Sequence, residues 1–290
     1  FVLGGGSNIL FTSNFKGVII KPELKGIKII NEDDETITIK VNNGEQWDSF
    51  VEWCVNHNYY GIENLSDIPG LVGSSPIQNI GAYGTEVKNY IITVEGYDIY
   101  SGEFLILNNF DCEFGYRTSI FKTKLQNRII VSSVVFRLYK KPNYCLNYPQ
   151  LVNELKNFNE INIKNIRNAV IKIRSTKLPD PNQIGNAGSF FKNPEVLYGK
   201  VLEIKNEYPD VQTYKTDNYK HKISAAWLIE KCGWKGYRKG NVGVYFNQPL
   251  VLVNYGGAQG IEILELAQMI QESVRKKFKI DLETEVNIIA

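Results

Sequence analysis

Runs of apolar and β-branched residues recur along the chain at the two-residue period of a strand. The clearest is ETITIKV, in which Ile37, Ile39 and Val41 alternate with threonine and lysine. Runs of four to eight such residues between polar turns are typical of strands. The pattern predicts strands at residues 17–21, 35–41, 90–100 and 128–139, and a closing strand in DLETEVNIIA, residues 281–290.

Other segments carry apolar residues at intervals of three and four, which is the period of a helix with one buried face. Trp47, Phe50, Val51 and Cys54 form the first such stripe. Similar stripes run from Ile163 to Ile173 and from Ile263 to Phe278, and a short helix is expected between a Ser224 cap and a Gly233 stop. Core packing explains these stripes, and strands that alternate with helices indicate an α+β protein.

Length and composition set the class of protein. With 290 residues, 43% hydrophobic and 12% aromatic, the chain can form one or two domains with a real core. The net charge of +2 gives no field to attract nucleic acid or an anionic membrane. We find no apolar run of the roughly 18 residues that a membrane span needs. We therefore expect a soluble, cytoplasmic protein without nucleic acid, membrane insertion or an obligatory protein partner.

Histidine and cysteine usage excludes several chemistries. The sequence has only His57 and His221, both expected at the surface, and no Gly-x-Ser-x-Gly nucleophile motif. Its four cysteines show no Cys-x-x-Cys spacing, which favours packed, reduced thiols over a metal site. The sequence predicts neither a serine–histidine triad nor a bound metal.

Two glycine-rich segments have the composition of ligand-binding loops. VLGGGSNILF follows a predicted strand with three glycines, Ser7 and Asn8, whose backbone and side chains can donate to phosphate oxygens. It lacks the Gly-x-Gly-x-x-Gly spacing, which argues against a Rossmann fold. The second segment, residues 68–87, places four glycines and several polar side chains in an apolar frame. Turn-rich loops would explain either segment alone.

A third segment, GNAGSFFKNP at residues 185–194, contains a single hydroxyl group, that of Ser189, between a glycine and two phenylalanines. Glycines at two positions loosen the backbone before Ser189, and two phenylalanines and Pro194 follow it. Close backbone approach and exclusion of water are what such residues can provide around a reactive group. A plain turn serine is the alternative for Ser189 considered alone.

Together, the motifs resemble one family. VLGGGSN, IPGLVGSSPIQNIGAYG, FGYRTSIFK, STKLPDP, GNAGSFFKNP and LETEV follow one another from Phe1 to the last strand. They resemble the UDP-N-acetylenolpyruvoylglucosamine reductases, flavoenzymes of peptidoglycan precursor synthesis. The resemblance implies an FAD-binding domain of the vanillyl-alcohol-oxidase type, made of two α/β subdomains, and a C-terminal α+β substrate-binding domain.

The resemblance also implies the reaction. NADPH reduces FAD, and the reduced FAD then passes a hydride to the enolpyruvyl group of UDP-N-acetylglucosamine enolpyruvate, giving UDP-N-acetylmuramate. Ser189 becomes the proton donor, Arg117 the group that holds the substrate carboxylate, and Glu285 the second catalytic carboxyl group. Asp281, Glu283 and Glu285 alternate along a predicted strand, so a solvated acidic face is the alternative, and the LETEV register favours Glu285.

Cofactor and substrate contacts are implied in the same way. FAD is expected to be noncovalent, because neither glycine-rich segment contains His or Cys. Its contacts would be Gly4, Gly5, Gly6, Ser7, Asn8, Ile68, Gly73, Ser74, Ser75, Gln78, Asn79, Gly81 and Val131. Substrate contacts would be Tyr83, Tyr148, Lys177, Asn193, Tyr214 and Gln248, with Tyr148 on the mobile loop found in one of the family's two types.

The expected domains follow the family's division. Residues 1–177, completed by 279–290, would bind FAD, and residues 178–278 would bind substrate, with LPDPNQ as the hinge. The chain opens inside a predicted strand, so we expect the family's first strand and helix to be missing. If that loss abolishes flavin binding, the chain would be a UDP-sugar-binding fragment; if only the scaffold is shared, it would be an oxygen-using flavoprotein oxidase.

Overall fold

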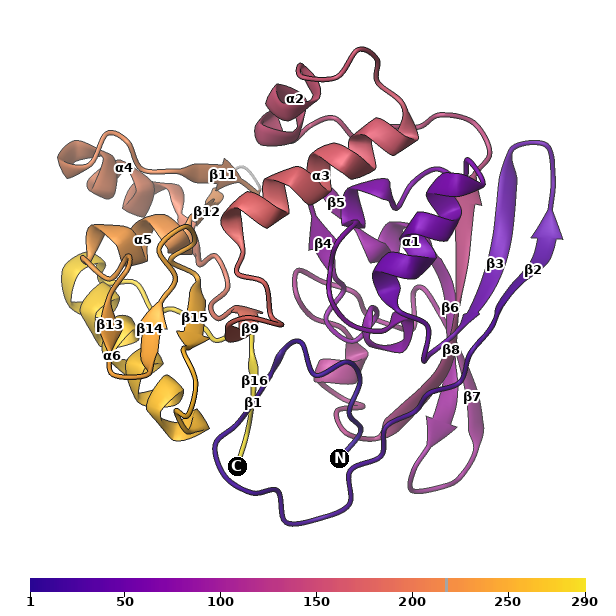
Figure 1. Cartoon of the computed structure of the whole chain (residues 1–290), viewed down its shortest axis with the longest axis horizontal. Helices are drawn as coiled ribbons and strands as arrows, with labels where there is room; N and C mark the ends of the chain where they lie inside the picture. The colour runs from indigo at the N-terminus through magenta and orange to yellow at the C-terminus, as the bar shows by residue number, and fades with distance from the viewer. Residues whose placement is uncertain (217–218) are drawn as a thin grey trace. The chain divides into compact units, whose positions relative to one another are not determined.

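The structure, a computed structural model that describes residues 1–216 and 219–290, contains two compact units (Figure 1). Unit 1 comprises residues 1–6 and 17–174, and unit 2 comprises residues 7–16 and 175–290. Each unit has a hydrophobic core of its own. The chain therefore leaves unit 1 directly after the three glycines of the first glycine-rich segment and returns to it ten residues later.

Unit 1 is built on an antiparallel sheet of five strands in the order β2-β3-β8-β6-β7. Predicted strands 35–41, 90–100 and 128–139 are confirmed as its three inner members. The two edge strands were not predicted, and most of their residues are exposed. The strands are β2 (Ile27–Glu32), β3 (Thr36–Asn42), β6 (Ile91–Asp98), β7 (Phe104–Asn108) and β8 (Ile129–Tyr139).

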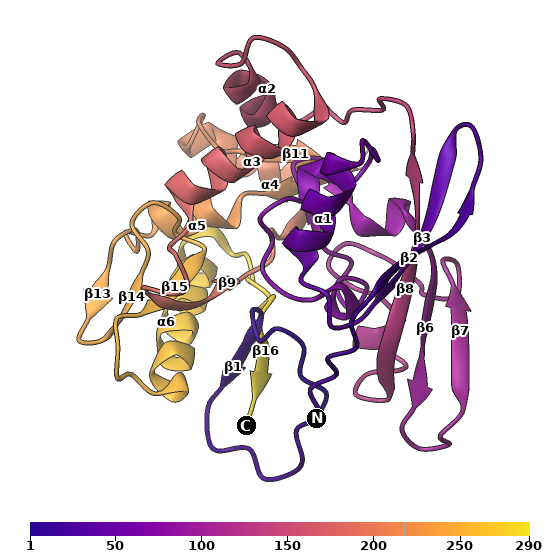
Figure 2. The same cartoon turned by 45° about the vertical axis from the view of Figure 1, so that its right-hand side comes forward.

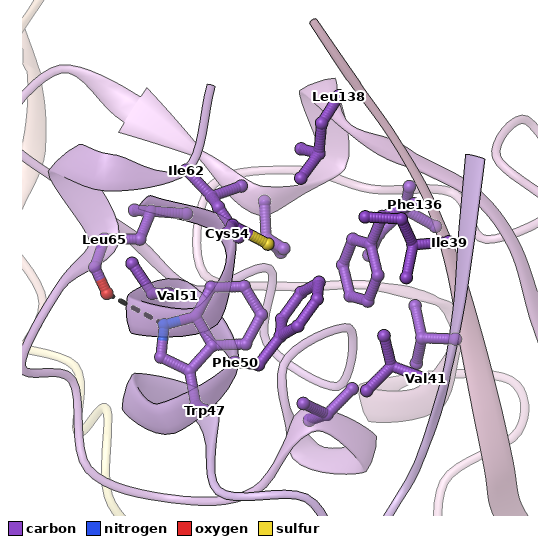
Figure 3. Close-up of a cluster of buried hydrophobic side chains, with 14 of the residues drawn as sticks. Ile39, Val41, Trp47, Phe50, Val51, Cys54, Ile62, Leu65, Phe136 and Leu138 are labelled. Atoms are coloured by element: carbon purple, nitrogen blue, oxygen red, sulfur yellow. Dashed lines mark hydrogen bonds between the residues drawn. The ribbon is translucent and has the colours of Figure 1, made fainter. Parts of the chain in front are cut away.

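Helix α1 (Trp47–Asn56) covers one face of this sheet with the stripe that its sequence predicts. Figure 3 shows Trp47 and Phe50 directed toward Phe136 of β8 and the isoleucine and valine side chains of β3. The indole Nε1 of Trp47 donates to the carbonyl oxygen of Leu65 at 2.8 Å, so this buried polar group is satisfied. The bond also anchors the loop that leads into the second glycine-rich segment.

Short elements and two further helices complete unit 1. Helices α2 (Pro149–Leu155) and α3 (Ile163–Lys177) pack on each other through a small separate core. The loops between strands contain 3₁₀ turns and two-residue strands: η1 (Glu63–Leu65), η2 (Val72–Ser74), β4 (Gly81–Ala82), β5 (Thr85–Glu86), η3 (Val87–Asn89) and η4 (Ile120–Lys122). Most of the predicted cofactor contacts lie in these irregular segments.

The described residues of unit 2 form two small antiparallel sheets and three helices. Helix α6 (Gly260–Phe278) follows the predicted stripe, and α5 (Ala225–Lys231) begins at Ser224, whose side chain accepts from the Trp227 amide. The sheets have the orders β13-β14-β15-β9 and β10-β12-β11. Their elements are β9 (Gly185–Ser189), β10 (Glu195–Leu197), α4 (Tyr198–Glu207), β11 (Thr213–Lys215), β12 (Lys220–Ile223), β13 (Arg238–Lys239), β14 (Val242–Val244) and β15 (Val251–Asn254).

The start and end of the chain meet within unit 2. Strand β1 (Ile9–Phe11) pairs in parallel with β16 (Asn287–Ile289), and Figure 2 shows the two side by side. The predicted closing strand is therefore shorter than expected. The predicted strand at 17–21 is wrong, since only Ile20 makes a bridge, to Val2, and Val18 remains 75% exposed.

The division into units differs from the predicted domain bounds at three points. The chain changes unit between Arg174 and Ser175, shortly before LPDPNQ, and both residues 7–16 and residues 279–290 pack in unit 2. Compactness does not show which segment binds which ligand, so the domain assignment stays a prediction. Over the described ranges, no helix combines the length and apolar character needed to cross a membrane, and no group of acidic, histidine and cysteine side chains is arranged to hold a metal ion.

Candidate active site

The two glycine-rich segments come together within unit 1 at their backbones. A Cβ atom placed on Gly5 would lie only 2.8 Å from the Cα of Gly70, and one on Gly4 would lie 2.0 Å from the Oγ of Ser74. At Gly5 the obstructing atoms are backbone, so glycine is required there, whereas at Gly4 the nearest atom is the end of the Ser74 side chain, which can rotate away. Residues 4–5 and 70–74 thus form one cradle of main chain, made from segments that the sequence marked separately.

Several predicted cofactor contacts in the second loop already use their side chains for internal bonds. Asn79 is 1% exposed, and its Nδ2 donates to Glu86 Oε2 at 3.0 Å and to the Gly115 carbonyl oxygen at 2.9 Å, while its Oδ1 accepts from the Lys88 amide. Both amide protons are therefore engaged. Ser75, also 1% exposed, donates to the Val72 carbonyl oxygen at 2.8 Å. Their peptide N–H groups are engaged as well, Ser75 with the Val72 carbonyl oxygen at 3.0 Å and Asn79 with the Pro76 carbonyl oxygen at 3.3 Å, so these two residues shape the loop from within.

The other predicted cofactor positions of unit 1 vary in burial. Val131 on β8 is 5% exposed, and its carbonyl oxygen accepts a hydrogen bond from Asn43. The remaining positions in the second loop are half-buried at Ile68, Gly73, Ser74, Gln78 and Gly81. Gly5 and Gly6 are exposed. The cradle therefore has an outward-facing edge at the first loop and a buried frame behind it.

Arg117 joins the same region of unit 1. It lies in a tight turn closed by the Gly115–Thr118 bridge and has a φ of 54°, in the left-handed region that few side chains tolerate. Its Nη2 donates to the Gly81 carbonyl oxygen at 2.9 Å. Because this bond fixes one edge of the planar guanidinium group, the strained turn presents the side chain in a defined orientation beside β4.

Two predicted substrate tyrosines also meet in unit 1. Tyr83, with a φ of 47°, and Tyr148, at the start of α2, lie edge to face with ring centroids 5.3 Å apart. Burial raises the pKa of the Tyr83 phenol above its ordinary value, so the hydroxyl is protonated at neutral pH. Asn64 donates to the Tyr83 carbonyl oxygen at 2.8 Å. Asn64 is not among the predicted site residues, and nothing in its local sequence indicates this hydrogen bond.

Unit 2 brings Ser189 and Glu285 onto neighbouring segments. Ser189 ends β9, pairs with Val251 and follows Gly188, whose φ is 73°. The next residue, Phe190, donates its amide to Leu250 and accepts from the Glu285 amide at 2.8 Å through its carbonyl oxygen. Phe191 bridges Thr284. Residues 190–192 and 283–285 therefore run side by side, with Ser189 and Glu285 at the same end of the pairing.

Burial distinguishes Glu285 from its acidic neighbours. Glu285 is 9% exposed, whereas Asp281 and Glu283 are exposed and paired with Arg275 and Lys192. The regular alternation breaks because the paired segment ends before β16, so Glu285 turns into the protein. The solvated acidic face considered from the sequence does not include Glu285.

The two phenylalanines that follow Ser189 pack in the core of unit 2. Phe190 and Phe191 are each 1% exposed, belong to the core of unit 2 and contact each other with ring centroids 5.2 Å apart. They anchor the backbone that carries Ser189. Gly188 supplies the turn before it, and a Cβ there would meet no atom within 4 Å among the described residues.

The remaining predicted contacts of unit 2 are spread over several elements. Asn8 holds the C-terminal segment, since its Nδ2 donates to the Glu285 carbonyl oxygen at 3.2 Å and its own carbonyl oxygen accepts from Asn287. Asn193 Oδ1 accepts from the first amide of α5, at Ala225, at 2.9 Å. Tyr214 on β11 is 46% exposed, and Gln248 and Ser7 are half-buried. At the end of α3, burial lowers the pKa of the Lys177 ammonium.

Comparison with known proteins decides the family. A model of an FAD binding domain matches residues 1–108, and a model of the UDP-N-acetylenolpyruvoylglucosamine reductase C-terminal domain matches residues 180–289. The reductase of Flavobacterium johnsoniae is 44% identical over 293 residues, covering 100% of this chain and 87% of the relative. That of Porphyromonas gingivalis is 46% identical and covers 99% and 85%. The chain belongs to the UDP-N-acetylenolpyruvoylglucosamine reductase family.

A solved structure supports the fold. The crystal structure of UDP-N-acetylenolpyruvylglucosamine reductase from Thermus caldophilus aligns with a TM-score of 0.68 at 23% identity, covering 100% of this chain and 85% of that one. The predicted fold class, an FAD-binding domain followed by the reductase C-terminal domain, is confirmed. Like its family, the protein is an FAD-dependent oxidoreductase.

The cradle of this family member fits a dinucleotide cofactor. The glycine-to-glycine contact at residues 5 and 70 keeps side chains out of the loop surface, so peptide N–H groups can approach a pyrophosphate. Ser74 lies at the same contact with a hydroxyl donor. The residues that would hold FAD in unit 1 are those at the accessible surface of the two loops, whereas the buried Ser75 and Asn79 would support the second loop from behind.

Proposed function

We propose that the protein reduces UDP-N-acetylglucosamine enolpyruvate to UDP-N-acetylmuramate with NADPH, through noncovalently bound FAD, in peptidoglycan precursor synthesis. The family membership supports the reductase activity. The residue roles rest on one observation in unit 2. A half-buried serine and a buried carboxyl group lie at the same end of a short paired segment, and a core phenylalanine fixes both.

The chemistry divides between the cofactor and the chain. Bound FAD would accept a hydride from NADPH and deliver it to the vinyl carbon of the enolpyruvyl group. The substrate then carries two extra electrons, which spread into its carboxylate as an enediolate. The chain must stabilise that charge and supply one proton to the neighbouring carbon.

Ser189 is proposed as the proton donor. A serine hydroxyl is a weak acid, but an enediolate is a strong base, so a positioned hydroxyl can protonate it without a histidine. The O–H bond breaks as the new C–H bond forms, and the serine oxygen regains its proton from solvent. Pairing of β9 with β15 and the buried rings of Phe190 and Phe191 hold the donor in place. Glu285 is the proposed second catalytic carboxyl group.

Arg117 is proposed to bind the substrate carboxylate. A guanidinium group offers a planar fork of donors that matches a carboxylate, which an ammonium group cannot do. The bond from Nη2 to Gly81 and the left-handed turn restrict how the fork can rotate. Such a group stabilises negative charge more strongly when it needs no reorganisation during the reaction.

The nucleotide-sugar part of the substrate is assigned to six side chains. Tyr83 and Tyr148 would contact it from unit 1, with Tyr148 on the loop that moves in one type of this family. Lys177, Asn193, Tyr214 and Gln248 would contact it from unit 2. A UDP-sugar and NADPH are cytoplasmic compounds, so the proposal includes a cytoplasmic location and needs no protein, nucleic-acid or membrane partner.

Separate half-reaction kinetics of Ser189→Ala test the proposal. Reduction of FAD by NADPH should stay within about twofold of the unmodified protein, whereas oxidation by the enolpyruvyl substrate should slow by about 10³-fold or more. Ser273→Ala, a half-buried serine of α6 in the same unit, should leave both half-reactions unchanged. An equal loss in both steps for Ser189→Ala would identify a structural serine instead.

The unmodified protein distinguishes the other activities. It should be yellow, and its NADPH oxidation should depend on the enolpyruvyl substrate. Colourless protein that binds UDP would indicate a binding fragment, and oxygen consumption with an alcohol in the absence of NADPH would indicate an oxidase.

A further inference from the structure

Two segments of unit 1 that are distant in sequence carry the tyrosine pair. Tyr83 lies between β4 and β5, and Tyr148 directly precedes α2, yet their rings meet edge to face at 84°. Both rings also pack against the small core between α2 and α3. An edge-to-face contact adds only modestly to the area that the two rings bury. Contact between the rings alone is therefore too weak to fix two loops.

Asn64 ties the bases of these two segments together. It lies in η1, is 1% exposed, and its Nδ2 donates to the carbonyl oxygens of Tyr83 and Cys145, both at 2.8 Å. Cys145 stands three residues before Tyr148, and its Sγ donates to the Gly84 carbonyl oxygen at 3.5 Å. One amide group thus uses both of its protons to hold the turn that carries Tyr83 to the irregular segment that leads into Tyr148.

The two hydrogen bonds that Asn64 donates indicate that its role is to position the segments that carry Tyr83 and Tyr148. Its Oδ1 is buried and meets no hydrogen-bonding group of residues 1–216 or 219–290. A buried acceptor without a protein partner lowers stability, so the contribution of this side chain lies in its two donor bonds. Tyr83 needs such support because a tyrosine with a φ of 47° is strained and would relax if its turn were released.

A second contact fixes the ring of Tyr83. Arg174 of α3 donates through Nε to the carbonyl oxygen of Asp67 at 3.0 Å and to its Oδ2 at 3.2 Å, and its guanidinium group also hydrogen-bonds the Tyr83 side chain. Asp67 itself has a φ of 60°. Tyr83 is held by Asn64 at its main chain and by Arg174 at its hydroxyl, whereas the segment before Tyr148 is held by Asn64 and Cys145.

We propose that Asn64 is a positioning residue that ties the turn of Tyr83 to the base of the Tyr148 loop, so that the two rings form one aromatic wall when the loop closes on the substrate. This inference rests on the proposed function, which assigns both tyrosines to the substrate. Without the amide, each tyrosine must be ordered separately when substrate binds. Ordering one side chain costs about 0.5–1.5 kcal/mol, so two cost enough to weaken binding by about tenfold.

Steady-state and half-reaction kinetics of Asn64→Leu, which keeps the volume and removes both donors, test the role. KM for the enolpyruvyl substrate should rise about tenfold, while kcat and the rate of FAD reduction by NADPH stay within about twofold. Asn64→Ser, which keeps one donor, should raise KM about threefold and gives a measurable protein if the leucine variant does not fold. A fall in kcat or in FAD retention with unchanged KM would overturn the proposal.

A matched control and a double-mutant cycle separate positioning from general loosening. Asn109 makes the same kind of clamp, with Nδ2 donating to the carbonyl oxygens of Lys88 and Ile91 at 2.7 and 2.9 Å, and Asn109→Ala should leave KM unchanged. In a Tyr148→Ala background, Asn64→Leu should raise KM less than threefold further, because the partner it positions is gone. Independent, multiplying effects would contradict the coupling.

Thiol reactivity gives a readout that does not depend on turnover. In a Cys232→Ser background, Cys54 and Cys112 stay buried, so a thiol reagent reports on Cys145. Asn64→Leu should speed its reaction several-fold. If the thiol reacts faster but KM is unchanged, Asn64 ties the segments but the tyrosines do not form a substrate wall, and the inference fails. If the unmodified protein does not turn over the enolpyruvyl substrate at all, the proposed function fails first.

Discussion

The two units hold their predicted site residues by different means. In unit 1, Asn79, Tyr83 and Arg117 all have left-handed backbone, with φ of 48°, 47° and 54°, and each lies outside a long strand or helix. In unit 2, Ser189 ends a paired strand, Glu285 is bonded to Phe190, and the only left-handed residue of residues 185–194 is Gly188. These residues of unit 1 therefore depend mainly on side chains that bond main-chain groups. Ser189 and Glu285 depend mainly on main-chain pairing, to which Asn8 adds one side-chain bond at the Glu285 carbonyl oxygen.

The two units should therefore respond differently to mutation. A strained turn held by one side chain loses its conformation when that side chain is removed. A segment held by backbone pairing keeps it when a side chain changes, and is sensitive instead to changes in φ. Substitutions chosen by this rule should affect the two units unequally.

The largest effect is expected for Asn79→Ala in unit 1. The variant loses the bonds to Glu86, Gly115 and Lys88 and leaves buried main-chain groups unsatisfied, which should lower the free energy of unfolding by about 3 kcal/mol. Asn127→Ala is the control, because Asn127 has a similar φ of 55° but is exposed, so it should lose about 1 kcal/mol or less. Urea unfolding followed by tryptophan fluorescence measures both.

Equal losses in the two variants would show that backbone strain, and not the buried amide bonds, dominates at Asn79. The contrast between the units would then rest on φ alone. The Asn79→Ala protein should also retain less FAD, because the second glycine-rich loop would no longer be fixed at its end.

An intermediate effect is expected for Gly188→Ala in unit 2. A Cβ there meets no atom within 4 Å in the described part of the chain, so the cost is the left-handed φ of 73°, about 1–2 kcal/mol. Gly240→Ala, with a φ of 60° and equally open surroundings, should cost the same stability. Only Gly188→Ala should also slow the step with the enolpyruvyl substrate, about tenfold, because relaxation of φ moves Ser189. Unchanged half-reactions in both variants would mean that the glycine does not aim the serine.

Sequence reasoning succeeded where periodicity extends over several turns or many strand residues. The stripe of α1 and the run that forms β8 each bury one continuous face, so local pattern and tertiary structure agree. It failed at residues 17–21, where Val18 and Ile19 satisfy the strand pattern but are 75% and 42% exposed. A run of β-branched residues has no sheet to join unless a neighbouring strand lies beside it. The short, lysine-containing strands of unit 2 gave too few periods to detect.

The candidate site was accessible from sequence only through its motifs. Gly5 and Gly70 appeared as two separate loops, and nothing in either predicts their backbone contact. The burial of Glu285 depends on where a paired segment ends, which alternation cannot indicate. Asn64 could not be found at all, because the two carbonyl groups that define its role lie 19 and 81 residues away.

The smallest effect is expected for Glu63, whose carboxyl group lies inside the core of unit 1. It is a pH dependence of stability that unit 1 should show and unit 2 should not. Glu63 is 1% exposed, and burial raises its pKa above the ordinary value, although the Gly61 amide, 2.6 Å from Oε2, favours the charged form. The folded state therefore keeps a proton that the unfolded chain releases as pH rises. Between the ordinary pKa and the raised one, the folded state binds more protons, so its stability falls with increasing pH.

Glu63→Gln removes this titration and keeps an oxygen that can accept from the Gly61 amide. Relative to the unmodified protein, the variant should gain stability as pH rises above the ordinary pKa of a glutamate carboxyl group, until the raised pKa of Glu63 is passed. Glu265→Gln, at an exposed position of α6 in unit 2, should show no such change. If the stability difference between Glu63→Gln and the unmodified protein is constant with pH, Glu63 is ionised in the folded core. The Gly61 amide would then stabilise the charge. Hydrogen bonding to main chain would outweigh the cost of desolvation even at this fully buried position of unit 1.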